Sequence, residues 1–135
     1  TVQIVYAARS KAALVAYKEI IDEWTNDSGI EVCLTIDNPQ DDWDGHVGFI
    51  PNYVKELNPD TSKTVIMCGP PIMIKFTLQG LKELGFVDTQ VFTTMEMRMK
   101  CGIGKCGRCN IGDKYVCKDG PVFSFDQLSE LPPEY

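Results

Sequence analysis

The stretch Thr64-Val-Ile-Met-Cys-Gly-Pro-Pro71, together with the residues that follow it to Leu84, decides the fold. The apolar run over residues 64–67 is typical of a strand that is buried on both faces. Because proline is well tolerated in the first turn of a helix, a helix over residues 72–84 can begin directly at this turn, with Gly85 as its C-terminal stop. A strand that passes through a tight turn into a helix is one unit of an α/β fold.

The same alternation extends outward on both sides of this unit. Short apolar runs and helical spacing of apolar residues predict further elements: strands over 2–7, 31–36 and 90–93, and helices over 11–25 and 50–57. Ser10 is the expected N-cap of the first helix. Because strands that alternate with helices pair in parallel through right-handed crossovers, we expect an open, doubly wound, mostly parallel sheet.

In such a sheet, ligands bind beyond the carboxyl ends of the strands. Three predicted strands end at turns typical of functional loops, namely Ala8-Arg9-Ser10, Asp37-Asn38 and Cys68-Gly69-Pro70, so we expect a nucleotide at this edge. No Gly-x-Gly-x-x-Gly run precedes a helix, so a glycine-rich phosphate loop is not among these residues. The chain begins at Thr1 without a Met and enters a strand at once, which we interpret as the start of a fragment of a longer polypeptide.

The composition is that of one ordinary globular domain, with 135 residues of which 44% are apolar and 24% are charged. No run approaches the roughly 20 apolar residues of a membrane span, and no signal peptide is present, so we expect a cytoplasmic protein. The net charge of -6 argues against nucleic acid as a partner. The charge is uneven, because residues 95–118 carry six Lys or Arg against two Asp or Glu, while the other 111 residues carry -10.

The six cysteines fall into two groups. Cys33 and Cys68 lie in apolar runs, where a cysteine usually behaves as a small buried hydrophobe. The other four lie within 17 residues, and we predict that they bind metal: Cys101, Cys106, Cys109 and Cys117. Four residues separate the first two and two separate the next pair, which matches the plant-type arrangement for a [2Fe-2S] cluster, although the fourth ligand comes sooner than in a ferredoxin.

The residues around these cysteines favour an iron-sulfur cluster. Backbone N–H groups must approach the sulfurs closely, which is easiest at residues without side chains: Gly102, Gly104 and Gly107. Three cationic side chains can offset the negative charge of the cluster: Lys100, Lys105 and Arg108. A tetrahedral zinc site made by the same four thiolates is the alternative.

A hairpin over residues 110–116, with its turn at Gly112-Asp113, would fold Cys117 back onto the other three cysteines. The alternation of strands and helices ends just before this region. We therefore divide the chain into a nucleotide-binding part over residues 1–97 and a cluster-binding segment with a C-terminal tail over residues 98–135.

Four stretches in this order carry a resemblance to a known family: Tyr6 to Ser10, Met67 to Pro71, Arg98 to Cys109 and Lys118 to Phe123. Together they resemble the C-terminal half of the ferredoxin-NADP reductase-like flavoproteins, in the branch with a C-terminal [2Fe-2S] cluster. That branch holds the gamma subunit of hydrogenase or sulfhydrogenase, the corresponding subunit of anaerobic sulfite reductase, and the electron-transfer subunit of dihydroorotate dehydrogenase B. The resemblance covers nearly the whole chain.

The resemblance implies a part of an NAD(P)H-dependent oxidoreductase. In such proteins FAD sits on a preceding barrel domain, and electrons pass between NAD(P)H, FAD and the cluster to a partner subunit such as a hydrogenase or sulfite reductase. The chain would begin at the second strand of the nucleotide-binding domain, so the first strand and its glycine-rich loop would be missing. We therefore expect the fragment alone to be inactive.

The resemblance also assigns nucleotide contacts. Arg9, with Ser10 beside it, matches the position that holds the adenosine side of the nucleotide, and Asp37 lies where the family meets the adenine ribose. A carboxylate there favours NADH over NADPH, because it hydrogen-bonds a 2′-hydroxyl and repels a 2′-phosphate. The turn beside the nicotinamide ring matches Cys68, Gly69 and Pro70. A surface arginine and a structural strand-to-helix turn would explain the same residues without a ligand.

A second hypothesis belongs to a different functional class. The C-terminal segment could be a zinc-stabilised interaction module on a degenerate nucleotide-binding domain, serving assembly instead of redox transfer. If the missing first strand normally lies in mid-sheet, open strand edges remain, and we predict a non-native dimer or a rearranged sheet.

Overall fold

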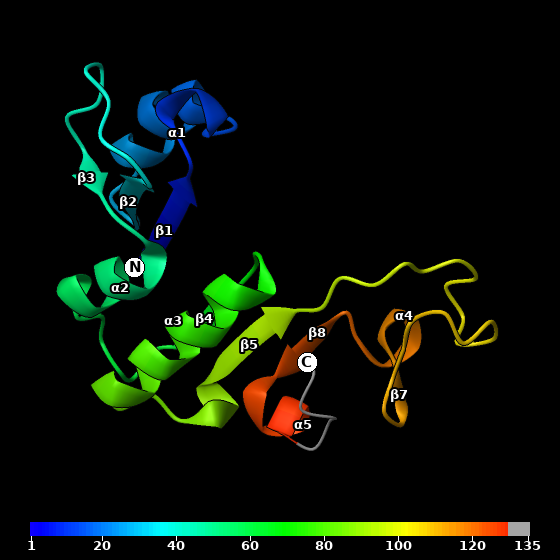
Figure 1. Cartoon of the computed structure of the whole chain (residues 1–135). Helices are drawn as coiled ribbons and strands as arrows, with labels where there is room; N and C mark the ends of the chain where they lie inside the picture. The colour runs from blue at the N-terminus through cyan, green and yellow to red at the C-terminus, as the bar shows by residue number, and fades with distance from the viewer. Residues whose placement is uncertain (130–135) are drawn as a thin grey trace. The chain divides into compact units, whose positions relative to one another are not determined.

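The computed structural model describes residues 1–129, which form two compact units (Figure 1). The first unit covers Thr1–Pro59, and the second begins at Asp60. Residues 130–135 lie outside the described residues, so the predicted cluster-binding segment over 98–135 is described only as far as residue 129. Within residues 1–129, no helix is long and apolar enough to cross a lipid bilayer.

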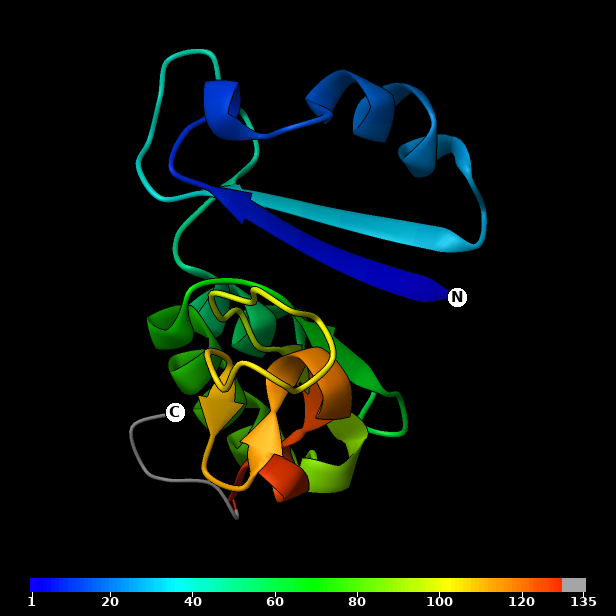
Figure 2. The ribbon, with the colours of Figure 1, turned by 90° about the vertical axis from the view of Figure 1, so that its right-hand side faces the viewer.

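The first unit contains a three-stranded parallel sheet in the order β1-β2-β3. β1 (Val2–Ala8) pairs along its whole length with β2 (Ile30–Ile36), and the short β3 (His46–Val47) pairs only with the end of β2. Figure 2 shows β1 and β2 as two long neighbouring strands. The two strands predicted from apolar runs over 2–7 and 31–36 are confirmed.

The single helix predicted over 11–25 is wrong. Three short pieces take its place: η1 (Lys11–Ala13), α1 (Tyr17–Asp22) and η2 (Trp24–Asn26). Ala16 has a φ of 58°, which a right-handed helix cannot contain, and this break lets both Leu14 and Ile20 reach the core. Ser10 occupies the N-cap position of η1, as predicted, but its side chain makes no capping hydrogen bond.

The helix predicted over 50–57 is confirmed as α2 (Ile50–Leu57). It has a proline in its first turn and ends at Asn58, whose left-handed backbone is a common helix stop. Val54 is the buried side chain of this helix, which contacts β1 of the same unit.

The second unit contains another three-stranded sheet, in the order β4-β5-β8. β4 (Val65–Met67) and β5 (Val91–Thr94) are parallel, and β8 (Val122–Ser124) is antiparallel to β5. Between the two parallel strands lie α3 (Pro71–Leu84), which ends at Gly85, and the short η3 (Asp88–Gln90). The predicted strand, turn and helix over residues 64–84 are confirmed, as is the strand predicted over 90–93.

The parallel strands are therefore divided between two sheets and do not form one. β1 and β4 are each an edge strand of their sheet, because no strand among residues 1–129 pairs with their outer sides. The parallel pairing of β1 with β2 and of β4 with β5 agrees with the predicted α/β class.

The cysteine-rich segment has a small core of its own. The predicted hairpin is present as β6 (Asn110–Ile111) and β7 (Lys114–Tyr115), with its turn at Gly112. The chain continues through α4 (Val116–Asp119), β8 and α5 (Phe125–Ser129). Four buried side chains from these elements pack together: Cys109, Ile111, Val116 and Phe123.

Candidate functional site

The loop from Cys101 to Cys109 connects β5 with the β6–β7 hairpin, and Cys117 lies in α4, directly after the hairpin (Figure 1). Three glycines in the loop have left-handed backbones: Gly102, Gly104 and Gly107, with φ of 72°, 70° and 72°. Only glycine adopts this conformation without strain, so the sequence permits a tightly curved loop here. The hairpin reverses the chain between Cys109 and Cys117, as predicted.

Backbone N–H groups point at three of the cysteine sulfurs. The N–H groups of Lys105 and Cys106 donate to Cys101 Sγ at 3.3 and 3.4 Å. The Gly104 N–H donates to Cys117 Sγ at 3.2 Å, and the Cys117 N–H donates to Cys109 Sγ at 3.5 Å. Such bonds stabilise negative charge on sulfur, which a thiolate ligand carries.

The thiols respond differently to these surroundings. Backbone N–H groups of Ile103, then Cys106 and Lys105, lower the pKa of Cys101 to about 6. The hydrogen bond with the Cys109 thiol, then burial, raises the pKa of Cys117. Cys101 is therefore poised to be a thiolate at neutral pH, whereas Cys117 keeps its proton to a higher pH.

The four predicted ligands differ in burial. Cys109 is buried within the small core of the segment, and Cys117 packs against that core. Cys106 is exposed, and its backbone N–H is bonded to the sulfur of Cys101. Within residues 1–129, no group of three His, Cys, Asp or Glu side chains is arranged to hold a single metal ion.

The donor set nevertheless fits a thiolate-bound group. The loop directs several N–H groups at sulfur, as an anionic cluster requires, and a side chain at Gly104 would bring its Cβ to 3.1 Å from Lys118 Cδ. Three thiolates from one loop and a fourth from α4 suit a [2Fe-2S] cluster or a zinc ion on chemical grounds alone.

The residues predicted to bind nucleotide lie at the carboxyl ends of strands, but in different units. Arg9 and Ser10 follow β1, and Asp37 follows β2. The Asp37 N–H donates to the Ala8 carbonyl at 3.1 Å, which ties the two turns of the first unit together. Arg9 is exposed, and Ser10 and Asp37 are half-buried.

The turn from Cys68 to Pro70 joins β4 to α3 in the second unit. Gly69 approaches α3 closely, because an added Cβ would lie 2.6 Å from Met73 Cε. Cys33 is buried, as predicted, but the burial predicted for Cys68 is wrong. Cys68 lies one residue beyond the end of β4, where the chain leaves the sheet, so its side chain is exposed.

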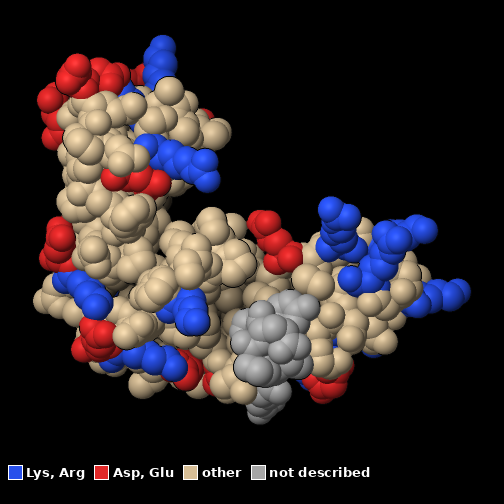
Figure 3. Space-filling view, viewed as in Figure 1, with Lys and Arg blue, Asp and Glu red and all other residues tan. Residues whose placement is uncertain are grey.

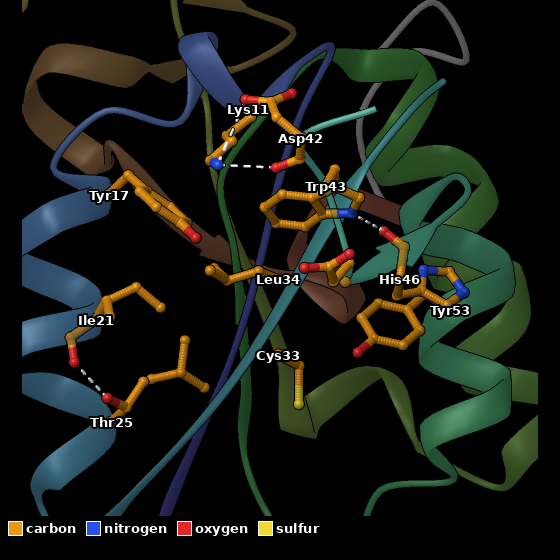
Figure 4. A pocket seen from close by; sticks show the side chains of 13 residues that line it. Lys11, Tyr17, Ile21, Thr25, Cys33, Leu34, Asp42, Trp43, His46 and Tyr53 are labelled. Carbon is orange, nitrogen blue, oxygen red and sulfur yellow. Dashed lines mark hydrogen bonds and ion pairs between the residues drawn. The ribbon is translucent and has the colours of Figure 1, made fainter. Parts of the chain in front are cut away.

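A cleft of about 370 Å³ lies beside β2 in the first unit (Figure 4). It is bordered by Tyr17 of α1, by Trp43 of the loop between β2 and β3, and by Tyr53 of α2. The Lys11–Asp42 ion pair, with a distance of 3.4 Å, lies at one end. The Trp43 indole N–H donates to the His46 carbonyl at 2.9 Å, so this loop is fixed against β3. The cleft does not include Arg9, Ser10 or Asp37.

The polar network around His46, the only histidine of the chain, is not predicted from sequence. The Thr35 hydroxyl donates to the Gly48 carbonyl at 2.8 Å, so it accepts a hydrogen bond from His46 Nδ1–H, also at 2.8 Å. His46 Nε2 lies 3.1 Å from the Glu56 carboxylate, and the ring stacks on Tyr53 with centroids 3.7 Å apart. The network joins β2, β3 and α2, and its partners are too far apart in sequence to be recognised there.

Two protein-family models match this chain. Residues 1–79 match the oxidoreductase NAD-binding domain, and residues 96–129 match the iron-sulfur cluster binding domain of dihydroorotate dehydrogenase B. The chain therefore belongs to the NAD-binding oxidoreductase family. More particularly, it joins an NAD-binding domain to an iron-sulfur cluster binding domain, as the resemblance predicted, which favours the cluster over a zinc ion.

Individual relatives agree with this assignment. The chain is 33% identical to the sulfhydrogenase 1 gamma subunit of Pyrococcus furiosus over 97% of its own length and 47% of the relative. It is 37% identical to a probable dihydroorotate dehydrogenase B (NAD(+)) electron transfer subunit of Methanocaldococcus jannaschii, over 92% of its length and 45% of the relative. The chain thus spans about half the length of the curated relatives it matches.

A solved structure confirms the fold over almost the whole chain. An NADH-dependent reduced ferredoxin-NADP oxidoreductase matches 98% of this chain and 48% of its own chain, with a TM-score of 0.63 and 26% identity. The predicted ferredoxin reductase-like nucleotide-binding fold followed by a cysteine-rich cluster-binding segment is therefore confirmed.

Proposed function

We propose that this chain is the nicotinamide-binding and cluster-binding part of an oxidoreductase electron-transfer subunit. The whole protein would pass electrons between NAD(P)H, FAD on a preceding domain and a [2Fe-2S] cluster, and on to a partner subunit such as a hydrogenase or sulfite reductase. The observation that carries this proposal is the cysteine loop, in which backbone N–H groups face the sulfurs, within a region matched by an iron-sulfur domain.

The chain's own residues would hold and insulate the cluster. Cys101, Cys106, Cys109 and Cys117 would supply the four thiolates. The N–H groups of Gly104, Lys105 and Cys106 would stabilise negative charge on sulfur, and the buried core behind Cys109 would fix one side of the site. When bound, a [2Fe-2S] cluster carries single electrons, and the protein tunes its potential through hydrogen bonds and exposure.

The nucleotide would be held from two strand ends and one turn. Arg9 and Ser10 would contact the adenosine side, and the Asp37 carboxylate would accept a hydrogen bond from the ribose 2′-hydroxyl, which favours NADH. The turn of Cys68, Gly69 and Pro70 would lie beside the nicotinamide ring. No side chain of this chain is proposed as an acid, base or nucleophile, because the redox chemistry belongs to the cofactors.

Three further parts of the proposal concern the chain as a whole. We place the boundary between the nucleotide-binding part and the cluster-binding segment between residues 97 and 98. We place the protein in the cytoplasm. Without the flavin domain, this chain alone would not oxidise NAD(P)H, because the acceptor of the hydride would be absent.

The first experiment is a measurement of iron, acid-labile sulfide and zinc in the anaerobically purified chain, together with its visible spectrum. About two iron and two sulfide per chain, with bleaching on reduction, are expected. Cys101→Ser and Cys109→Ser should each lose iron, whereas Cys68→Ser, outside the loop, should keep it. One zinc without sulfide, in this chain and in the longer polypeptide, would instead support the zinc-stabilised interaction module.

A further inference from the structure

The cysteine loop is surrounded by positive side chains. Five exposed residues form this basic rim: Arg98, Lys100, Lys105, Arg108 and Lys118. Among the described residues, none of the five makes an ion pair, whereas the neighbouring Lys114 pairs with Asp113 at 3.5 Å. Figure 3 shows Lys and Arg side chains gathered over this end of the second unit.

The loop that carries these cations also has an exposed apolar side chain. Ile103 lies between Gly102 and Gly104 in the sequence and is 68% exposed. Met99, directly before Lys100, is also exposed. Exposed aliphatic side chains ringed by charged ones are typical of a protein-binding surface.

Neutralising the cluster does not account for this arrangement. A [2Fe-2S] cluster with four thiolates has a net charge of about -2 when oxidised. The five positive charges of the rim exceed the number needed to neutralise it. Nor does charge neutralisation require an exposed Ile103. The rim is also local, because the residues outside 95–118 carry a net charge of -10.

We propose that the basic rim and Ile103 form the docking surface for an electron-transfer protein with an acidic face. This inference rests on the proposed function, since it supplies the partner chemistry of the same site. The rim would steer an acidic partner to the loop and orient it, and Ile103 would supply the apolar contact at the centre. The strongly acidic remainder of the chain would repel an acidic partner elsewhere, so docking would be confined to the cluster-bearing end.

A protein fits this surface better than a nucleic acid or a lipid bilayer does. A nucleic acid would meet the repulsion of the acidic remainder along its length. Two exposed apolar side chains, Ile103 and Met99, also lie among the cations in the sequence, which suits a protein interface of small area. Nucleic acid and anionic lipid are therefore included in the test as competitors.

The test measures binding of the full-length holoprotein to a plant-type ferredoxin, a small acidic electron-transfer protein, by isothermal titration calorimetry. Binding should weaken at least tenfold when NaCl rises from about 0.1 M to about 1 M, because charge screening shortens from about 10 Å to about 3 Å. The double variant Lys105→Glu/Arg108→Glu should bind about tenfold or more weakly. Ile103→Ser should bind about fivefold more weakly with its salt dependence unchanged.

Lys63→Glu is the matched control, because Lys63 is an exposed lysine outside the rim and the change has the same sign of charge. It should bind ferredoxin as the unaltered protein does. Iron and sulfide are measured on every variant, so that loss of the cluster is separated from loss of docking. If the double variant loses its cluster, Arg98→Glu/Lys100→Glu, which lies before the first cysteine, makes the same test.

The proposal is overturned if the cluster-loaded protein does not bind ferredoxin at low salt, or if Lys63→Glu weakens binding as much as the rim variants do. Tighter binding to duplex DNA or to phosphatidylserine vesicles than to ferredoxin would also overturn it. A protein without iron and sulfide would refute the proposed function instead, which keeps the two failures distinguishable.

Discussion

Replacing Gly104 with alanine tests whether the cysteine loop depends on its left-handed backbone. Gly104 has a φ of 70°, and an alanine held there loses about 1–2 kcal/mol. Alanine also restricts the unfolded chain, which offsets about 0.4–1 kcal/mol of that loss. The new Cβ would lie 3.1 Å from Cδ of Lys118, whose exposed side chain can move aside, so the steric contribution is small. The expected net destabilisation of the folded loop is about 1 kcal/mol.

Gly102→Ala separates the backbone effect from the steric one. Gly102 has a similar φ of 72°, but an added Cβ would meet nothing within 4 Å. The two variants should therefore lose nearly the same stability. The alanine N–H is retained in both, so the hydrogen bond from residue 104 to Cys117 Sγ is not itself removed.

The assay is the equilibrium transfer of iron from the loaded protein to a chelator, followed by the visible spectrum. A loss of about 1 kcal/mol corresponds to about a fivefold shift of the transfer midpoint toward lower chelator concentration. If both alanine variants keep their iron as firmly as the unaltered protein, the loop does not hold these backbone conformations when loaded, and the reasoning is refuted. If Gly104→Ala alone loses iron much more easily, the Lys118 side chain cannot move away from the new Cβ, and the steric contribution is larger than expected.

Four further outcomes are expected. In the metal-free chain, the lowered pKa of Cys101 should keep its alkylation by iodoacetamide rapid down to about pH 6. Unfolding in urea should abolish this behaviour, because the backbone N–H groups no longer donate to the sulfur. An unchanged pH profile in urea would contradict the prediction. Burial raises the pKa of Cys33, so at pH 8 mass spectrometry should find Cys33 labelled much more slowly than the exposed Cys68. Asp37→Ser should raise the kcat/KM ratio of NADPH over NADH in the full-length holoenzyme, while an unaltered ratio would remove Asp37 from the ribose site. Ala16→Gly should raise the free energy of unfolding by about 0.5–1 kcal/mol in urea titration, because the φ of 58° suits glycine better than alanine.

Much of the second unit could be predicted from sequence because its signals are local. The apolar run over residues 64–67, the prolines of the turn and Gly85 mark the ends of β4 and α3 within a few residues. The hairpin follows from Gly112, and the four cysteines are recognisable by spacing alone. In each case the residues that fix the structure lie within one short stretch, which is what pattern reasoning detects.

The wrong prediction for residues 11–25 has a different origin. Alanine is the strongest helix former, so Ala16 carries no signal for a break. We attribute the break to tertiary packing. Leu14, before Ala16, is 4% exposed and Ile20, after it, is 2% exposed, so the turn at Ala16 allows both side chains to be buried. The His46 network could not be predicted for a similar reason, because Thr35 and Glu56 reach the ring only when β2, β3 and α2 are assembled.

The two proposed sites therefore depend on the fold to different degrees. The cysteine site lies within one unit, and its N–H donors, its glycines and its buried anchor Cys109 come from a single stretch of chain. The proposed nucleotide residues are divided, with Arg9 and Asp37 in the first unit and the Cys68 turn in the second. A change at Asp37 should consequently leave the iron content of the protein unaltered, while a change in the loop should leave the strands of the first unit intact. The proposed cluster site therefore depends mainly on local sequence, whereas the residues proposed to contact the nucleotide come from both units.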